Sequence, residues 1–298
     1  MERLALWRKK VEDFLEMALP APAEPPAVLH QAMRHALRGG KRLRPALVFA
    51  AYEAIAGADA PPWVNQVAGA VEALHAYSLV HDDLPAMDDA QYRHGLPAVH
   101  RQYGEATAIL VGDALQALAF QWLGEAPWPS PHLGLRAVVL LGRAAGSLGL
   151  VGGQQDDLSW ERQAAGEKEL ESLYRRKTGC LLEASLLLGG LAAGAGPAEE
   201  AWLRRIAGPM GLGYQVADDV LDVAGNLETL GKDGGLDEER GRVTYVTLLG
   251  LEGAREKARR LFEIAGREAF PLGERAQGLL EIIAFMGERL EAQREMKP

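Results

Sequence analysis

The sequence predicts an all-α protein, and three observations lead to this fold class. Apolar residues recur at helical spacing through most of the chain, and no convincing run alternates with a period of two. Leu, Ala and Gly dominate, whereas the β-branched and aromatic alternation typical of strands is scarce. Prolines and glycines divide the chain into helical lengths without a large shift in composition. We therefore expect one all-α domain over residues 1–298, with about ten helices and no fixed-period repeat.

The expected helices follow this punctuation in chain order. The first ends before the prolines between residues 20 and 26, and further prolines divide the middle of the chain at 127–131. Glycines and a proline at 194–197 end a later helix, and the two glutamates that follow suit a first helical turn. The clearest apolar faces span residues 4–15, 47–54, 201–212 and 279–290. The polar stretch 226–244 is too long for an ordinary connector and is a candidate functional loop.

Composition and charge restrict the possible function classes. Asp and Glu number 41 against 32 Lys and Arg, and the net charge of −9 argues against a general nucleic-acid binder. With 48% hydrophobic and 24% charged residues, the composition is that of a globular protein rather than a disordered one. The longest uncharged apolar stretch, 184–196, is well short of the about 20 residues that cross a bilayer. We therefore expect no membrane span.

The N-terminus and the cysteine content predict a cytoplasmic location. No basic cluster at the N-terminus leads into an apolar stretch and a cleavage site, so export is not expected. Cys180 is the only cysteine, which excludes an internal disulfide and a multi-cysteine metal site. Because Cys180 lies among leucines without an adjacent base, we interpret it as a core residue rather than a nucleophile.

Two acidic clusters directly follow apolar helical runs. The run 74–80 leads into the first cluster, and the run 210–217 leads into the second. Their members are Asp82, Asp83, Asp88 and Asp89, and Asp218, Asp219 and Asp222. On a helix, spacings of three and four residues place all members of the second cluster on one face. In the first cluster, residues seven apart share a side if the helix continues through Pro85.

The two clusters together favour a magnesium site. Like charges this close destabilise each other unless a cation lies among them. Carboxylate oxygens, completed by water and phosphate oxygens, are the ligands that Mg²⁺ prefers. Ca²⁺ is a weaker alternative because no glycine-punctuated twelve-residue loop accompanies either cluster. A solvated acidic helix end would explain one such cluster as well as a metal site does, but it explains two of them poorly.

A dense basic patch spans residues 34–45 of this acidic chain. Its Gly39-Gly40 step lets the backbone approach an anion, and arginine can hold a phosphate with two donors. Further cations recur at Arg93, Arg175, Arg176, Lys177, Lys232 and Arg242. The clusters and the patch predict a phosphorylated substrate held through metal and a second phosphate held directly. The apolar helices beside the acidic ends suggest that the rest of the ligand is hydrocarbon.

The ordered set of motifs resembles the trans-isoprenyl diphosphate synthases, the family of farnesyl and geranylgeranyl diphosphate synthases. Residues 39–45 (GGKRLRP) look like the family's isopentenyl-diphosphate motif. Residues 82–89 (DDLPAMDD) look like its first aspartate-rich motif, in the bacterial form with two extra residues, and 215–222 (QVADDVLD) like its second. Between them, and at family-like spacing, stand Gly112-Asp113, Gly152-Gly153-Gln154, Asp157-Leu158 and Lys177-Thr178-Gly179. The resemblance covers nearly the whole chain.

This resemblance implies antiparallel helices packed around a deep central cavity, usually in a homodimer. It implies three Mg²⁺ ions per site, with Mn²⁺ able to substitute, bound by the aspartates Asp82, Asp83, Asp88, Asp89, Asp218, Asp219 and Asp222. These ions and the cations Arg93, Lys177 and Lys232 would hold an allylic diphosphate. The Thr178 carbonyl and the Gln215 side chain would stabilise the carbocation left by its ionisation. The expected catalytic set is Lys177, Thr178, Gln215, Asp82 and Asp218.

The resemblance also implies a second substrate and a limit on product length. Isopentenyl diphosphate would be held by Lys41, Arg44 and His75, with His94 where an arginine usually contacts it. Gly40 and Arg242 complete the expected substrate-binding residues. It would attack through its double bond, and the released pyrophosphate would take the final proton. Tyr77, with Ser78 beside it, lies about 7.5 Å deeper along the helix than Asp82. An aromatic residue there goes with a fifteen-carbon product, so farnesyl diphosphate is expected ahead of geranylgeranyl diphosphate; an ordinary core aromatic is the alternative for Tyr77.

The sequence departs from the family pattern at three positions. His94 stands where a second arginine is common, Arg242 replaces a usual lysine, and Val246 replaces a usual proline. His94 therefore puts the affinity for isopentenyl diphosphate in question. A terpenoid cyclase is disfavoured because it has no second diphosphate to hold, and a non-catalytic subunit because both acidic motifs are intact. The C-terminal run 288–297 is interpreted as a solvated helix face, with Arg289 reaching a diphosphate as the alternative.

Overall fold

A computed structural model describes residues 2–159, 166–224 and 243–291. The described chain is almost entirely helical and confirms the predicted all-α class. In chain order its elements are α1 (Glu2–Ala18), α2 (Ala27–Ala36), α3 (Leu43–Ala56), α4 (Val64–Asp82), β1 (Tyr92–Arg93), β2 (Leu96–Pro97), α5 (Val99–Tyr103), α6 (Glu105–Glu125), α7 (Pro131–Ala145), α8 (Leu150–Ser159), α9 (Glu167–Tyr174), the π-helical turn η1 (Arg175–Gly179), α10 (Cys180–Ala192), α11 (Pro197–Ala224), α14 (Tyr245–Ala269), the 3₁₀ segment η2 (Phe270–Ala276) and α15 (Gln277–Glu291).

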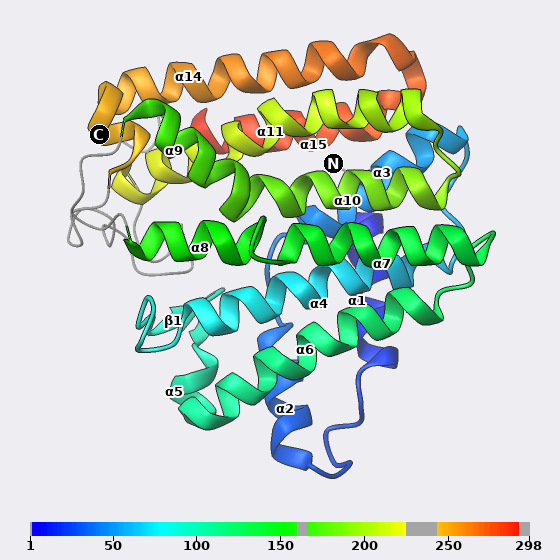
Figure 1. Ribbon diagram of the computed structural model, residues 1–298, viewed down its shortest axis with the longest axis vertical. Coiled ribbons are helices and arrows are strands. Elements are labelled where there is room, and N and C mark those ends of the chain that lie inside the picture. Colours follow the sequence, from blue (N-terminus) through cyan, green and yellow to red (C-terminus); the bar gives the residue numbers. More distant parts are fainter. Residues whose placement is uncertain (1, 160–165, 225–242, 292–298) are drawn as a thin grey trace.

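The long helices run side by side across the molecule (Figure 1). Helix α4 packs along α6 and α3, α10 packs along α3 and α11, and α14 lies along α11. Helices α3, α4 and α10 are apolar nearly all round because neighbours surround them, as the fully buried Leu47, Val48 and Phe49 illustrate. The core therefore runs continuously through the centre of the bundle.

Local sequence sets the starts of two helices that border the core. Ser130 caps α7, because its side-chain oxygen accepts a hydrogen bond from the Leu133 backbone amide, and Pro131 fits the first turn. Thr244 caps α14 and exchanges side-chain and backbone hydrogen bonds with Thr247 in a capping box. These caps satisfy amide groups that the first turn of a helix leaves without an intrahelical partner.

The C-terminal ends of α4, α8 and α11 gather at one end of the bundle, on the left of Figure 1. Close backbone contacts bring α8, η1 and α11 together there. A Cβ atom at Gly153 of α8 would lie 2.3 Å from the Lys177 backbone nitrogen, and one at Gly211 of α11 would lie 3.0 Å from the Gly179 Cα atom. Only glycine allows such close approach, so these residues let α8 and α11 pack directly against the backbone of η1.

Two features of local structure go beyond what the sequence predicts. Helix α4 ends at Asp82 and does not continue through Pro85, because a following turn closes the chain back on the helix end. A short antiparallel pair, β1 with β2, also forms in the described chain, with a two-residue loop at His94 and Gly95. Both loop residues have positive φ, 54° and 76°, as in a type I′ turn. Strands of two residues are too short to give an alternating pattern.

Two helical segments are long and apolar enough to cross a membrane by length and composition alone, Glu105–Glu125 and Pro131–Ser159. A search for uncharged stretches overlooks them because charged residues such as Asp113 and Arg136 interrupt each one. Leu115, Leu123 and Leu141 on these segments are fully buried in the bundle core. The expected absence of a membrane span stays a prediction.

Candidate active site

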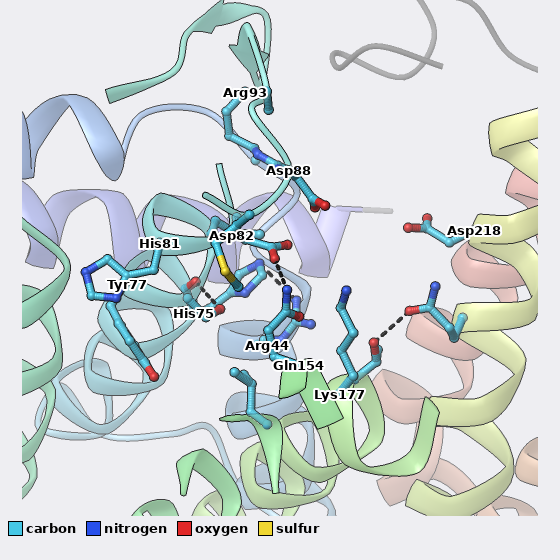
Figure 2. Close-up of a pocket in the computed structure, with 18 of the residues that line it drawn as sticks. Arg44, His75, Tyr77, His81, Asp82, Asp88, Arg93, Gln154, Lys177 and Asp218 are labelled. Atoms are coloured by element: carbon cyan, nitrogen blue, oxygen red, sulfur yellow. Dashed lines mark hydrogen bonds between the residues drawn. The ribbon is translucent and has the colours of Figure 1, made fainter. Parts of the chain in front are cut away.

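A cavity of about 760 Å³ opens where α4, α8 and α11 end. Its walls come from α3 and the segment before it, from α4 and the chain that follows it, and from α6, α8, η1, α11 and α15. Figure 2 shows Asp218 on α11 facing Asp82 and Asp88 across this space, with Lys177 below them. Volume and shape suit a ligand of small-molecule size.

The turn after α4 separates the four aspartates of the first acidic cluster. The Asp88 amide donates a hydrogen bond to the Asp82 carbonyl at 2.8 Å, and the Asp89 amide donates to the Leu84 carbonyl at 3.0 Å. This turn, in which Asp89 has a positive φ of 44°, leaves Asp82 and Asp88 lining the cavity. Asp83 and Asp89 are absent from its described lining.

Asp83 and Asp89 instead hold the turn in place. Arg93 Nε donates to Asp83 Oδ1 at 3.0 Å, and the Asp83 side chain is almost fully buried. Asp89 accepts from Arg101 Nη2 at 2.9 Å and lies 3.7 Å from His100 Nε2. Arg93 lines the cavity as expected, but its guanidinium is engaged by Asp83.

The second acidic cluster stays on one helix, and its members diverge through packing. Asp218 and Asp222, one turn apart on α11, both line the cavity. Asp219 is buried on the other side, where its Oδ2 accepts from the Tyr174 hydroxyl at 2.7 Å and from the Tyr245 amide at 2.9 Å. The expectation that all three share one face therefore holds for Asp218 and Asp222 only.

The cavity-facing carboxylates suit a divalent cation that is shared with a ligand. Burial, together with the charges of Asp88 and Asp83, raises the pKa of Asp82 to about 6, although Lys177 and Arg93 oppose this rise. A cation would relieve the cost of this buried charge. Among the described residues, no three His, Cys, Asp or Glu side chains gather closely enough to hold a metal by themselves. Mg²⁺ commonly takes one or two carboxylates and completes its shell with phosphate oxygens and water, which fits facing pairs of carboxylates.

Helix α8 and the turn η1 supply the polar floor beneath the carboxylates. Gln154 Nε2 donates to Asp82 Oδ1, and Lys177 Nζ donates to Asp157 Oδ2 at 2.6 Å. The Thr178 hydroxyl donates to Gln215 Oε1 at 2.6 Å. Lys177 and Thr178 sit in the π-helical turn η1, a feature frequent at functional sites. Gln154 and Asp157 are absent from the predicted site, although the motif that contains them marks their segment.

The basic patch forms another wall of the same cavity. Gly39 and Gly40 adopt positive φ values of 72° and 81°, which only glycine tolerates readily, and the His94 ring packs against them. Arg44 Nη1 donates to His75 Nε2 at 3.0 Å. Burial and the Arg44 charge hold the pKa of His75 well below its ordinary value, so His75 is neutral and accepts this hydrogen bond.

His94 lies beside these groups as a neutral side chain. Burial and the charges of Arg93, Arg42 and Lys41 lower the pKa of His94 to about 4. An ion pair that the sequence analysis missed lies beneath the wall: Arg42 donates to Glu72, and both side chains are almost fully buried. Arg42 also donates to the Leu37 carbonyl at the end of α2, so its two partners hold the segment after the glycine step against α2 and α4. A buried glutamate within an apolar helix is the signal that could have revealed it.

An apolar arm leads away from the charged walls along α4. Tyr77 is buried, lines the arm, and its ring packs edge-on against His81 with centroids 5.4 Å apart. His81 packs closely on Gly112 of α6, where any Cβ atom would clash with the ring. Further apolar residues line the cavity: Leu79, Leu84, Met87, Ile109, Leu150, Val151 and Leu158. Ser78 also lines the cavity, and its hydroxyl donates to the His75 carbonyl.

Two predicted site residues, Lys232 and Arg242, lie outside the described residues. The remaining predicted residues line the cavity, except Asp83, Asp89 and Asp219. Arg289, interpreted from the sequence mainly as part of a solvated helix face, also lines it.

An all-α bundle whose cavity combines facing carboxylates, a cationic wall and an apolar arm defines an enzyme class that handles hydrocarbon diphosphates with a divalent metal. The chain belongs to the polyprenyl synthetase family, whose model matches residues 26–282. The family resemblance and the prenyltransferase class expected from the sequence are thereby confirmed.

Relatives of known identity cover most of the chain. It is 45% identical over 264 residues to farnesyl diphosphate synthase of Escherichia coli K12, covering 86% of each chain. It is 43% identical over 265 residues to geranylgeranyl pyrophosphate synthase 9 of Arabidopsis thaliana, covering 87% of this chain and 73% of the relative. Among solved structures, a geranyltransferase from Helicobacter pylori complexed with magnesium and isoprenyl diphosphate superposes with a TM-score of 0.83 at 31% identity, covering 98% of both chains.

Proposed function

We propose that this chain condenses isopentenyl diphosphate with dimethylallyl or geranyl diphosphate to make farnesyl diphosphate. The observation that carries the proposal is one cavity with two facing acidic walls, a separate cationic wall and an apolar arm bordered by Tyr77. Two charged subsites suit two diphosphates, and the apolar arm suits a growing hydrocarbon. Both farnesyl and geranylgeranyl synthases occur among the relatives, so the length of the arm decides between these products.

The acidic walls would hold the allylic diphosphate through magnesium. Asp82 and Asp88 on one side, and Asp218 and Asp222 on the other, are the proposed ligands. When bound, three Mg²⁺ ions, or Mn²⁺ in their place, would neutralise the charge that develops on the departing diphosphate. Asp83, Asp89 and Asp219 would act from behind by fixing the turn and helix that carry these ligands.

The polar floor would bind and stabilise the reacting groups. Lys177, held by Asp157, would contact the allylic diphosphate while its carbon–oxygen bond breaks and the electron pair leaves on oxygen. The Thr178 carbonyl and the Gln215 side chain would face the resulting allylic carbocation as fixed dipoles. Arg93 and Lys232 are proposed as further cations at this diphosphate.

The cationic wall would position isopentenyl diphosphate for attack. Lys41 and Arg44 would contact its diphosphate directly, with the Gly40 backbone and His75 beside them. Its double bond would form the new carbon–carbon bond, and a proton lost from the condensed product would pass to the released pyrophosphate. His94 would contribute a neutral hydrogen bond where the family pattern has a charge, and Arg242 would add a cation. His94→Arg is therefore expected to lower the Michaelis constant for isopentenyl diphosphate.

Product analysis tests this function and its chain-length limit together. Purified protein would receive Mg²⁺, labelled isopentenyl diphosphate and, separately, dimethylallyl, geranyl or farnesyl diphosphate. We expect fifteen-carbon alcohols after dephosphorylation. Tyr77→Ala should lengthen the products by removing the aromatic ring from the arm, whereas Tyr77→Phe keeps the ring and is the matched control. A wild-type product of twenty carbons or more would overturn the role of Tyr77, and no incorporation with any primer would overturn the function.

We further propose a cytoplasmic homodimer without a nucleic-acid partner. Large apolar side chains are exposed along α6 and α7, including Ile109, Leu110, Leu135 and Val139. Large exposed apolar side chains on neighbouring helices favour burial against another subunit. Sedimentation velocity of the purified enzyme checks this proposal, because a monomer at micromolar concentration would contradict it.

A further inference from the structure

Arg289 of α15 reaches the acidic wall from a distant part of the chain. Its Nη2 donates to Asp218 Oδ1 at 3.2 Å, although 71 positions separate the two residues. The side chain is only 14% exposed, against 29% for Asp218, so the ion pair is partly shielded from water. Arg289 therefore binds a carboxylate that faces the cavity, and it is not simply a solvent-exposed residue on the surface of α15.

Arg289 also faces the cationic wall. Its guanidinium lies over the Tyr214 ring, 5.3 Å from the ring centre. Arg44, proposed to hold isopentenyl diphosphate, shares the electrostatic neighbours Tyr214 and Asp218 with Arg289. Arg289 therefore stands near both subsites, next to a proposed metal ligand and close to a proposed phosphate ligand.

The guanidinium has bonding capacity that the described chain does not use. Arg289 Nη1 is buried and makes no hydrogen bond to any described residue. A buried donor without a partner is costly, and phosphate oxygens are acceptors that arginine binds well. Arg289 lines the cavity in which such oxygens would lie.

We propose that Arg289 is a substrate-binding residue that couples the two subsites. In the empty enzyme it neutralises Asp218. Once a cation binds Asp218, the guanidinium and that cation repel each other, and Arg289 turns its donors to the diphosphate of isopentenyl diphosphate. Cation binding at the acidic wall and binding of the second substrate would then favour each other. This inference rests on the proposed function, because it assumes which ligand occupies each subsite.

Metal-free binding of isopentenyl diphosphate, measured by calorimetry in the presence of chelator, tests the coupling. Asp218→Asn weakens the hold on Arg289 and should tighten binding about five- to tenfold. Arg289→Gln and the double variant Asp218→Asn/Arg289→Gln should bind isopentenyl diphosphate with equal affinity. In both variants the arginine is absent, so the change at Asp218 cannot release it. Circular dichroism melting of each variant confirms that it is folded.

The double variant separates this coupling from the simple loss of a negative charge. If charge alone matters, Asp218→Asn should tighten binding by the same factor with or without Arg289, and that result would overturn the inference. Asp82→Asn, which removes a carboxylate of the opposite wall beside Gln154, is the matched control and should change binding less than about twofold. No tightening in Asp218→Asn would also overturn the inference. Product formation by the wild type with Mg²⁺ is measured in parallel, because its absence would count against the proposed function instead.

Discussion

The two acidic regions of this enzyme reach the same arrangement by different routes. After α4, a turn divides four aspartates, so that Asp82 and Asp88 face the cavity while their immediate neighbours bind Arg93 and Arg101. On α11 the helix is unbroken, and its periodicity keeps Asp218 and Asp222 on the cavity side. In both regions, a carboxylate next to a cavity-facing one binds other parts of the chain and holds the turn or helix in place.

This difference shows that neighbouring identical residues need not share a function. In the turn, the backbone chooses which carboxylates face the cavity, whereas on α11 the buried partners Tyr174 and Tyr245 draw Asp219 away. The comparison predicts two kinds of mutant: cavity-facing substitutions that abolish catalysis, and anchoring substitutions that mainly lower stability. The following tests are ordered by expected effect.

Loss of a carboxylate from either wall should have the largest effect. Asp82→Asn and Asp218→Asn each remove a negative charge that faces the proposed metal-bound diphosphate. We expect kcat/KM to fall by about a thousandfold or more in each variant, as loss of a metal ligand does for metal-stabilised charge. Steady-state kinetics with geranyl diphosphate measure this, and near-normal rates in either variant would contradict the role of that wall.

Adjacent residues in the first region provide a sharper contrast. Asp88→Asn should lower kcat/KM about a hundredfold, because Asp88 faces the cavity. Asp89→Asn should change it less than about threefold, since its half-exposed carboxylate pairs with Arg101 and such pairs contribute about 0–1 kcal/mol. Equal losses in the two variants would show that the turn does not sort these aspartates.

The pH dependence should report the first region. Burial raises the pKa of Asp82 to about 6, so its carboxylate takes up a proton as the pH falls through that value. The protonated form binds a cation poorly, and kcat/KM should therefore fall about tenfold per pH unit below 6. Gln154→Ala, which removes the hydrogen bond to Asp82, should move this acid limit upward. If Gln154→Ala leaves the acid side of the pH profile unchanged, the group that titrates there is not Asp82.

The anchoring role of Asp219 should appear as a modest loss of stability. Asp219→Ala removes the acceptor for the Tyr174 hydroxyl and the Tyr245 amide, both in buried surroundings. We expect unfolding free energy to fall by about 1–3 kcal/mol, which denaturant titration measures. Tyr174→Phe removes one of these bonds and should lose less. Unchanged stability in Asp219→Ala would contradict an anchoring role.

The fold was predictable because helical spacing and proline or glycine punctuation act locally. The cavity-facing pair on α11 was predictable for the same reason, since a four-residue spacing on a helix fixes a shared face. The end of α4 was not, because hydrogen bonds within the following turn close the chain back at Asp82. Nothing in residues 82–89 themselves indicates which carboxylates Arg93 and Arg101 will hold.

Contacts between distant segments account for the remaining misses. Arg289 meets Asp218 only after α15 packs along α11, and Glu72 meets Arg42 only after α3 packs on α4. The motif around Gln154 marks its segment, but the hydrogen bond to Asp82 depends on the close approach of α8 to η1 at Gly153. Such pairings need the packed bundle, so single-sequence patterns reveal the residues without their partners.

The central claim is that the two acidic walls act together on one metal-bound diphosphate, and equilibrium binding of geranyl diphosphate tests it most directly. Without isopentenyl diphosphate no condensation occurs, so calorimetry with and without Mg²⁺ isolates the contribution of metal. We expect Mg²⁺ to tighten binding about a hundredfold in the wild type and in Asp89→Asn, and only a few-fold in Asp82→Asn and in Asp218→Asn. A full magnesium effect in either wall variant would contradict the claim.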